Sequence, residues 1–323
     1  MNVAEYLAAH ERNTNSYKDF VDEVIFTIKE ECEAKGLKIA DIKGRVKTRQ
    51  SLADKIERHR IENPEQHVFD YAGVRIVCLF EEEKRVFSNL LNELFDVSWQ
   101  SDKKESLGVA HMGYQSIHTC VAFGDSYSGT RYRKFKGYVC EVQVTTVLLE
   151  AWALINHTIV YKNENSVPIS LQRELNNVSS LLEVAQNIFD EAFKKRTAYL
   201  VKLGTLSNNS LLIQLIDYDS LTVYSENKYP ELKISEFWQN SLIVDLNKNK
   251  YKNLSDIDNV VNKAKEFIEY YMDKRPDLFQ FSTDILTKSL GYIDFEFRSR
   301  HDFAESTLRA FEHFENHRIG KRI

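Results

Sequence analysis

The chain has 323 residues, a formal net charge of −5, and a composition that is 43% hydrophobic and 28% charged. This length fits one large domain or two ordinary ones with a sizeable core, and the charge excludes a protein that is basic overall. The N-terminal sequence MNVAEYLAAHERN lacks the apolar stretch of a signal peptide, and no run of about 18 apolar residues occurs. We therefore expect a cytoplasmic protein without a membrane partner.

The first part of the chain alternates helical and strand patterns. Apolar residues recur at helical spacing over residues 3–35, and Gly36 follows where a helix end favours a left-handed residue. A strand is predicted over 39–47 and a helix over 51–62, with Ser51 as its N-terminal cap and Pro64 as its stop.

The middle of the chain predicts a central sheet with flanking helices. The segment 70–80 is too apolar for an exposed strand, and further strands are predicted over 118–124 and 137–146. Amphipathic helices are predicted over 81–95, 148–162 and 171–196. We predict a mixed α/β fold with a central mixed β-sheet flanked by helices.

The pattern changes near residues 200–210, where LGTLSNNS is typical of a linker. Strands are predicted over 211–224 and 242–248, and helices near 254–274 and 302–317. We therefore expect one domain at 1–200 and a small α/β C-terminal domain at 211–323.

Cysteine usage argues against disulfides and zinc. Cys32, Cys78, Cys120 and Cys140 are widely spaced, without a CxxC pair, and three of them fall in predicted strands. Buried free thiols are the expected outcome.

A group of cations lies at the predicted turn from strand to helix in GRVKTRQSLADK (44–55). Arg45, Lys47 and Lys55 flank the helix start near Ser51, and such a start with nearby cations suits a phosphate. A solvated basic edge is the alternative for this segment taken alone.

Two acidic residues lie on separate predicted strands. Asp70 precedes an apolar strand, where it is either a turn residue or a ligand, and Arg75 within that strand needs a partner. Glu141 and Gln143 share one face of the strand 138–145. Asp70 and Glu141 together offer two hard oxygen ligands, and Mg²⁺ takes one or two carboxylates in addition to phosphate oxygens.

The segment GYQSIHT (113–119) places an aromatic ring and an imidazole on one strand face. Tyr114, Ser116 and His118 alternate with Gln115 and Ile117. This face suits base stacking and phosphate contact, while a half-buried tyrosine with a satisfied histidine is the alternative.

In order and separation, the motifs GRVK, DYAGVRI, GYQSIHT, EVQ and HTIVYK (157–162) resemble the synthetase domain of the RelA/SpoT family, the alarmone synthetases. The resemblance covers roughly residues 40–165 and implies a nucleotidyltransferase-like fold. It implies a GTP/GDP pyrophosphokinase that transfers the β,γ-pyrophosphate of ATP to the 3′-hydroxyl of a guanosine nucleotide, with Mg²⁺ as cofactor.

The resemblance also assigns roles to individual residues. Asp70 and Glu141 would hold the metal, with Glu141 also activating the attacking hydroxyl, and Gln143 would accompany them in the catalytic set. Tyr114 would stack on the acceptor base, and His118 would contact its phosphate side. Arg45 and Arg75 would bracket the adenine of ATP. The ATP phosphates would be held by Lys47, Ser51, Lys55 and Arg58.

Two departures fall on the acceptor side. Thr145 replaces an arginine common in the family, and Glu150 stands where an asparagine that helps read the acceptor is common in small synthetases, so the resemblance places Glu150 on the acceptor side. The only His-Asp pair, His301-Asp302, lies far beyond the synthetase motifs, so no hydrolase activity is expected. The chain resembles a small synthetase-only member with an unfamiliar C-terminal extension.

Other readings remain open. Basic and aromatic residues in RYRKFK (131–136), with Lys103 and Lys104, suit RNA, so the acceptor is alternatively a tRNA 3′ end or an adenine nucleotide. In that case the C-terminal domain would be a fused inhibitor, or an antitoxin that senses phage in a defence module. A catalytically inactive nucleotide-binding regulator is a third possibility, and a homo-oligomer is expected by resemblance.

Overall fold

The computed structural model describes residues 3–102, 116–159, 168–249 and 251–320. Contacts within the chain divide it into unit 1, Met1–Phe193, and unit 2, Lys194–Ile323. The long helix α9 (Ile169–Thr205) begins in unit 1 and ends in unit 2. Each unit has its own hydrophobic core.

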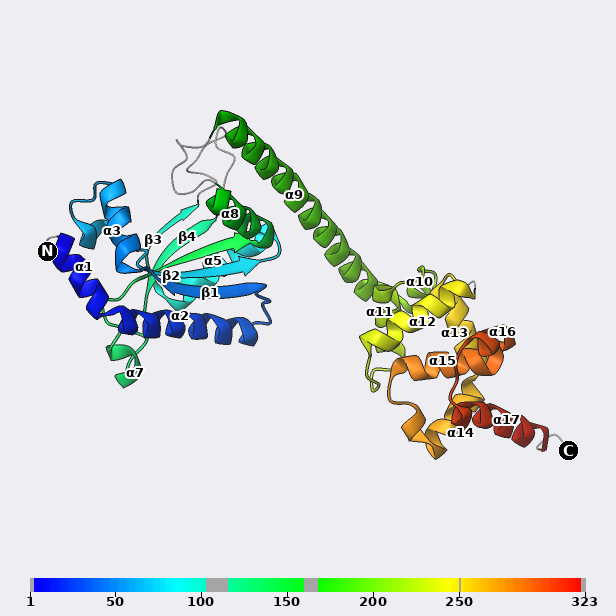
Figure 1. Ribbon diagram of the computed structural model, residues 1–323. Coiled ribbons are helices and arrows are strands. Elements are labelled where there is room, and N and C mark those ends of the chain that lie inside the picture. Colours follow the sequence, from blue (N-terminus) through cyan, green and yellow to red (C-terminus); the bar gives the residue numbers. More distant parts are fainter. Residues whose placement is uncertain (1–2, 103–115, 160–167, 250, 321–323) are drawn as a thin grey trace. The chain divides into compact units, whose positions relative to one another are not determined.

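Unit 1 is built on a five-stranded mixed sheet with the order β1-β2-β5-β4-β3 (Figure 1). The central pair β2 and β5 is parallel, and the other neighbours are antiparallel. The strands are β1 (Asp41–Val46), β2 (Ala72–Cys78), β3 (Asp96–Asp102), β4 (Ile117–Ala122) and β5 (Cys140–Thr146). The prediction of a mixed α/β fold is confirmed, whereas the strand β3 was not predicted.

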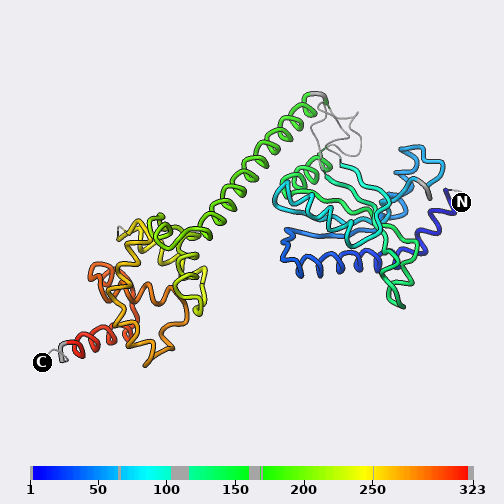
Figure 2. Tube along the Cα trace, turned by 180° about the vertical axis from the view of Figure 1, so that it is seen from behind, coloured from blue at the N-terminus to red at the C-terminus, as the bar shows by residue number. Residues whose placement is uncertain are grey.

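Helices flank this sheet. Figure 2 shows the path of the chain from behind. The helices are α1 (Val3–Arg12), α2 (Thr14–Ala34), α3 (Arg49–Arg58), α4 (Pro64–His67), α5 (Glu81–Leu94), α7 (Thr130–Arg133) and α8 (Val147–Ile159). The predicted helix at 51–62 is α3, but Thr48 rather than Ser51 caps it, since the Thr48 side chain accepts from the Ser51 backbone N–H. The stop at Pro64 was wrong, because α3 ends at Arg58 and Pro64 begins α4.

The side chains of β1 and β2 alternate between an apolar face and a polar face. Phe20 and Ile28 of α2 are fully buried, as is Ile76 of β2. At Gly44 of β1, an added Cβ would lie 2.2 Å from Val21 Cγ1, so glycine permits the close approach of β1 to α2. The alternate residues of the strands therefore point to the opposite face of the sheet.

That opposite face collects polar residues from four strands. Cross-strand pairing places Lys43 beside Arg75, Arg75 beside Gln143, and Gln143 beside His118. Glu141, two residues before Gln143 in β5, pairs with Gly73 of β2. Helix α8 contacts β2 and β5.

The regular secondary structure of unit 2, over its described residues, consists of helices joined by turns and loops, with two isolated bridges. The predicted strands at 211–224 and 242–248 were wrong. Asp217 caps α11 through the Ser220 backbone N–H, and Leu242 and Leu246 lie buried one turn apart in α12. Apolar runs of this length fit a strand and a buried helix equally well, and here the caps select the helix.

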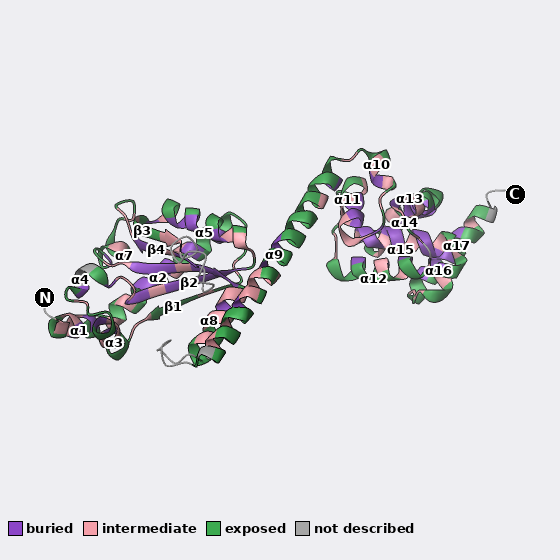
Figure 3. Ribbon diagram, turned by 90° about the horizontal axis from the view of Figure 1, so that it is seen from above, coloured by how far each residue is buried: buried purple, intermediate pink, exposed green. Residues whose placement is uncertain are grey.

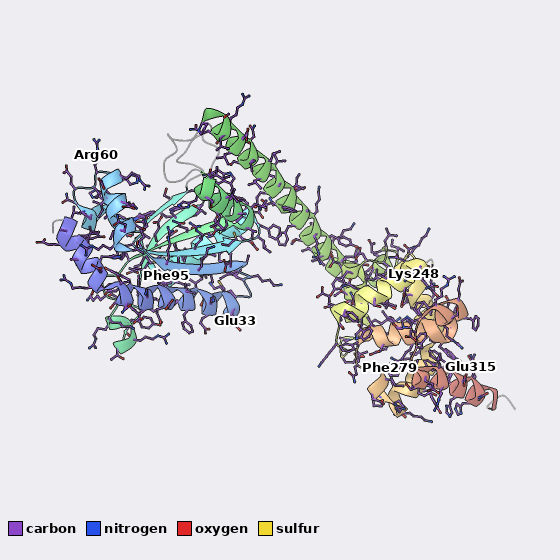
Figure 4. All side chains as sticks on the ribbon, viewed as in Figure 1. Glu33, Arg60, Phe95, Lys248, Phe279 and Glu315 are labelled. Atoms are coloured by element: carbon purple, nitrogen blue, oxygen red, sulfur yellow. The ribbon has the colours of Figure 1, made fainter. Side chains whose placement is uncertain are left out.

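The unit 2 helices surround a core that contains fully buried Leu221, Leu246 and Phe297 (Figure 3). They are α10 (Asn208–Leu212), α11 (Tyr218–Lys228), α12 (Glu236–Lys248), α13 (Leu254–Lys263), α14 (Lys265–Lys274), η2 (Pro276–Leu278), α15 (Ser282–Ile293), α16 (Phe295–Arg300) and α17 (Glu305–Gly320). The predicted linker is partly helical, because α9 continues to Thr205 and buries Leu203. Phe279, labelled in Figure 4, is part of the same core.

Candidate active site

A cavity of about 200 Å³ opens on the polar face of the unit 1 sheet. Six of the predicted site residues line it together: Arg45, Asp70, Arg75, Glu141, Gln143 and Glu150. Lys43, Gly44, Gly73, Val74 and Leu154 complete the lining. Residues predicted from separate motifs therefore share one site.

Asp70, at the entrance to β2, accepts bonds from two lysines. Lys55 Nζ of α3 donates to Oδ1 at 2.7 Å, and Lys47 Nζ donates to Oδ2. Burial acts to raise the pKa of Asp70, but the two lysine hydrogen bonds outweigh it and leave the pKa below its usual value. Asp70 is therefore an ionised carboxylate held between two cations.

Lys47 has a lowered pKa because burial disfavours its ammonium form, and the bond to Asp70 offsets only part of this effect. Its carbonyl oxygen is 3.0 Å from His10 Nε2. A cation that is partly desolvated at a fixed place interacts more strongly with an added anion than a cation in water does.

Glu141 lies in the middle of the site on β5, and its side chain forms a hydrogen bond with His118 Nδ1 of β4. Burial acts to raise the pKa of Glu141, but this bond and the histidine charge keep the pKa lowered, while the nearby charge of Asp70 opposes them. The effect of Asp70 on Glu141 is consistent with their common cavity. His118 Nε2 lies 2.6 Å from Ser116 Oγ, which completes a chain of three side chains.

Arg75 is held by hydrogen bonds to β5 and α8. Its Nε and Nη2 donate to Gln143 Oε1 at 3.2 and 2.8 Å, and Nη1 donates to Glu150 Oε2 at 2.8 Å. Lys43 Nζ lies 2.7 Å from Glu150 Oε1. The predicted need of Arg75 for a partner is thus confirmed.

Several predicted residues lie away from the cavity lining. Ser51 and Arg58 are exposed on α3. Tyr114, Lys103 and Lys104 lie outside the described residues, as does the end of the motif HTIVYK.

The basic segment 131–136 is partly neutralised within unit 1. Arg131 pairs with Glu23 at 2.8 Å, and Lys134 pairs with Asp19 at 3.1 Å, both on α2. Thr145 is fully buried in β5 and does not belong to the cavity lining.

Two residues at the site were missed from the sequence. Lys43 precedes Arg45 by two positions in a strand, so alternation alone would have placed both on one face. Ser116 was assigned to the His118 face but was given no role, and its hydrogen bond to the imidazole depends on the side-chain geometry.

The donor set fits a magnesium ion that is shared with a phosphate ligand. No group of three or more His, Cys, Asp or Glu side chains able to hold a metal occurs where the structure is described. The cavity lining instead contains three carboxylates: Glu150 is paired with Arg75 and Lys43, and Asp70 and Glu141 are the candidate metal ligands. Mg²⁺ is usually bound by one or two carboxylates, with water and substrate phosphates as its other ligands.

Residues 44–166 match the family model described as a region found in RelA/SpoT proteins. This stretch of the chain is similar to the region shared by RelA/SpoT proteins. The prediction of this family from the motifs is confirmed, and the matched region includes Arg45, Asp70, Glu141 and Glu150. The match ends before unit 2 begins.

Individual relatives agree with this assignment. GTP pyrophosphokinase YwaC of Bacillus subtilis (strain 168) is 29% identical over 148 residues, which cover 44% of this chain and 68% of that protein. GTP pyrophosphokinase YjbM of the same organism is 27% identical over 164 residues, 49% of this chain and 75% of that protein. The crystal structure of small alarmone synthetase 1 from Bacillus subtilis has 25% identity and a TM-score of 0.50, and covers 58% of this chain and 97% of that structure.

Across its described residues, the protein has no helix whose length and apolar character would allow it to span a membrane. The cysteines Cys32, Cys78, Cys120 and Cys140 are buried free thiols, as predicted.

Proposed function

We propose that the RelA/SpoT domain transfers the β,γ-pyrophosphate of ATP to the 3′-hydroxyl of GDP or GTP, which yields (p)ppGpp. The observation that carries the proposal is the common cavity of Asp70, Glu141 and Arg75, with Lys47 and Lys55 bonded to Asp70. The names of two relatives, both GTP pyrophosphokinases, support the same reaction.

ATP would be held through its base and its phosphates. Arg45 and Arg75 line the cavity and offer guanidinium planes to adenine. Lys47 and Lys55 would contact the phosphates, because both ammonium groups are bonded to Asp70, which lines the cavity. Fixed cations of this kind also stabilise the charge that develops during phosphoryl transfer.

The chemical step forms one bond and breaks one bond. The 3′-oxygen of the acceptor attacks the β-phosphorus of ATP, the bond from that phosphorus to the oxygen bridging the α-phosphate breaks, and AMP leaves. The hydroxyl proton passes to Glu141, whose lowered pKa keeps it ionised before the step. The hydrogen bond to His118 keeps the carboxylate of Glu141 in place.

Asp70 and Glu141 would hold Mg²⁺ together with ATP phosphate oxygens. The ion supplies charge neutralisation on the transferring group. Gln143 would orient Glu141 and Arg75, since its side chain forms hydrogen bonds with Glu141 at 3.5 Å and with Arg75 at 2.8 Å. Tyr114 remains the proposed stacking partner of the acceptor base.

The direct test is transfer from ATP labelled in its γ-phosphate, in the presence of Mg²⁺, to GDP, GTP, AMP or deacylated tRNA offered separately. We expect label on the guanosine nucleotides and release of AMP. ATP binding without transfer to any acceptor would contradict the proposal and favour the inactive regulator.

The second candidate is transfer to a tRNA 3′ end or an adenine nucleotide. Arg133 and Lys136 remain exposed in the basic segment, while Arg131 and Lys134 pair with acidic residues of α2. Label on tRNA, lost on the double substitution Arg133→Ala and Lys136→Ala, would favour this candidate. Label on GDP that is insensitive to the same substitution favours the first.

For unit 2 we propose a regulatory role as an inhibitor of the transfer reaction, with an antitoxin that senses phage as its most specific form. The domain boundaries 1–200 and 211–323 also remain a proposal. Comparison of the full chain with residues 1–200 tests both: higher specific activity of a soluble truncated protein supports inhibition, and unchanged activity contradicts it. Sedimentation of the full chain would test the proposed homo-oligomer.

A further inference from the structure

Glu150 is a buried acid at the cavity wall. It lies in the first turn of α8 and is only 6% exposed. Its Oε2 accepts from Arg75 at 2.8 Å, and its Oε1 lies 2.7 Å from Lys43 Nζ. A buried carboxylate is costly unless it is paired, so both cations stabilise it at this position.

The partners of Glu150 fix the orientation of Arg75. Gln143 accepts from Nε and Nη2 of the guanidinium, and Glu150 accepts from Nη1. Bonds from two separate elements, β5 and α8, define the plane of the group. The guanidinium donors on these edges are already used, so the planar surface is the part of Arg75 suited to an aromatic ring.

Gly73 lies between the two arginines of the cavity. It is the cross-strand partner of Arg45 and is two residues from Arg75 on the same face. A Cβ built at Gly73 has Arg45 Cγ and the Glu141 carbonyl oxygen as neighbours at 3.8 Å. The glycine therefore adds no side chain beside Arg45 in the cavity lining.

We propose that Glu150 is a positioning residue for ATP, which acts by holding Arg75 as a stacking surface for adenine, and that it does not read the acceptor base. This inference rests on the proposed function, because it requires ATP in the cavity. It differs from the expectation from the sequence, which placed Glu150 on the acceptor side.

The first experiment measures equilibrium binding of α,β-methylene-ATP in the absence of an acceptor. Glu150→Ala is expected to weaken binding about tenfold, equivalent to about 1.4 kcal/mol. Glu150→Gln, which retains a hydrogen-bond acceptor but loses the charge, is expected to have a smaller effect. Glu174→Gln, the same change at an exposed site on α9, is the matched control and should bind as the wild type does.

The second experiment separates the two substrates. For Glu150→Ala we expect the KM for ATP to rise about tenfold and the KM for GDP to stay within about twofold. A rise in the KM for GDP with unchanged binding of α,β-methylene-ATP would overturn the inference and return Glu150 to the acceptor. Thermal unfolding of each variant separates these effects from a loss of fold.

A double-mutant cycle tests whether Glu150 acts through Arg75. If it does, Glu150→Ala combined with Arg75→Ala weakens α,β-methylene-ATP binding no more than Arg75→Ala alone. Additive losses would overturn the inference. Failure of the wild-type chain to bind the analogue would overturn the proposed function as well, whereas binding without transfer to GDP would overturn only the proposed acceptor.

Discussion

The two units differ in what they bury. Unit 1 encloses charged side chains, including Lys84, Glu141, Glu150 and Asp190, each less than a tenth exposed. The buried polar residues described in unit 2 are all uncharged, and they include Ser220, Gln239, Ser282 and Thr307. Buried charge costs stability unless partners offset it, and two of these residues, Glu141 and Glu150, line the candidate site.

Charged residues in unit 2 mainly serve helix ends and partly exposed pairs. Asp217 and Asp294 cap α11 and α16, and Asp258 pairs with Lys228 at the edge of the core. This arrangement predicts that substitutions of acids affect activity in unit 1 and stability in unit 2.

The largest expected effect is that of Glu141→Gln on the rate of pyrophosphate transfer. Loss of the carboxylate removes both a proposed metal ligand and the acceptor of the hydroxyl proton, so the rate of transfer should fall about 10³-fold. The assay is release of AMP from ATP in the presence of GDP, with circular dichroism to confirm the fold. A variant with the wild-type rate would remove Glu141 from the mechanism and break the contrast between the units.

In unit 2 the largest expected effect is on folding. Phe267 is 1% exposed and stacks on Tyr292 at a centroid distance of 4.5 Å. Phe267→Ala should lower the free energy of unfolding by about 3–5 kcal/mol through the cavity it leaves. Urea unfolding followed by circular dichroism measures this, and Phe295→Ala, at a site 76% exposed, is the control. Equal losses in both variants would contradict the assigned core.

Gly44→Ala should destabilise unit 1 by about 1–3 kcal/mol, because the added Cβ overpacks the contact between β1 and α2. The nearest atom, Val21 Cγ1, would be at only 2.2 Å. Gly204→Ala, in a helix where an added Cβ meets nothing within 4 Å, is the control and should not destabilise. The comparison is made by thermal unfolding, and an equally stable Gly44→Ala would show that α2 adjusts freely.

The smallest expected effect is that of Asp258→Asn, about 1–2 kcal/mol at neutral pH. Burial acts to raise the pKa of Asp258, but hydrogen bonds from Lys228 and Tyr224 outweigh it and lower the pKa. The stabilisation is therefore complete above the usual aspartate pKa of about 3.9 and is lost as the pH falls through the lower folded value. Unfolding of wild type and variant from pH 7 to pH 2 should converge at the acidic end, and a difference that grows there would contradict this sign.

Much of unit 1 was predictable because strong local signals agree with its tertiary structure. Gly36 has φ 65°, as expected at the end of α2. The apolar segment 70–80 contains the central strand β2. By contrast, β3 alternates polar residues with Val97 and Trp99 at an edge of the sheet, and so short a polar pattern does not distinguish a strand from a loop.

The site was predictable as a set of residues, but its connections were not. Motifs identified Asp70, Arg75 and Glu141, which line one cavity. Pairwise contacts such as Arg75 with Glu150 join residues 75 positions apart, and only the register of the strands and the placement of α8 bring them together. In unit 2 a helix was predicted as a strand, since Asp217 was not recognised as a helix cap.

The position of β1 at the border of the sheet has a consequence for handling the protein. Among the described strands its backbone pairs with β2 alone, so within that part of the chain its other side is a strand edge of the kind that recruits further strands. Lys43 and Arg45 are exposed on this strand, and cations there discourage self-association. Neutralising both residues would therefore promote aggregation, and light scattering should accompany every kinetic measurement on such variants.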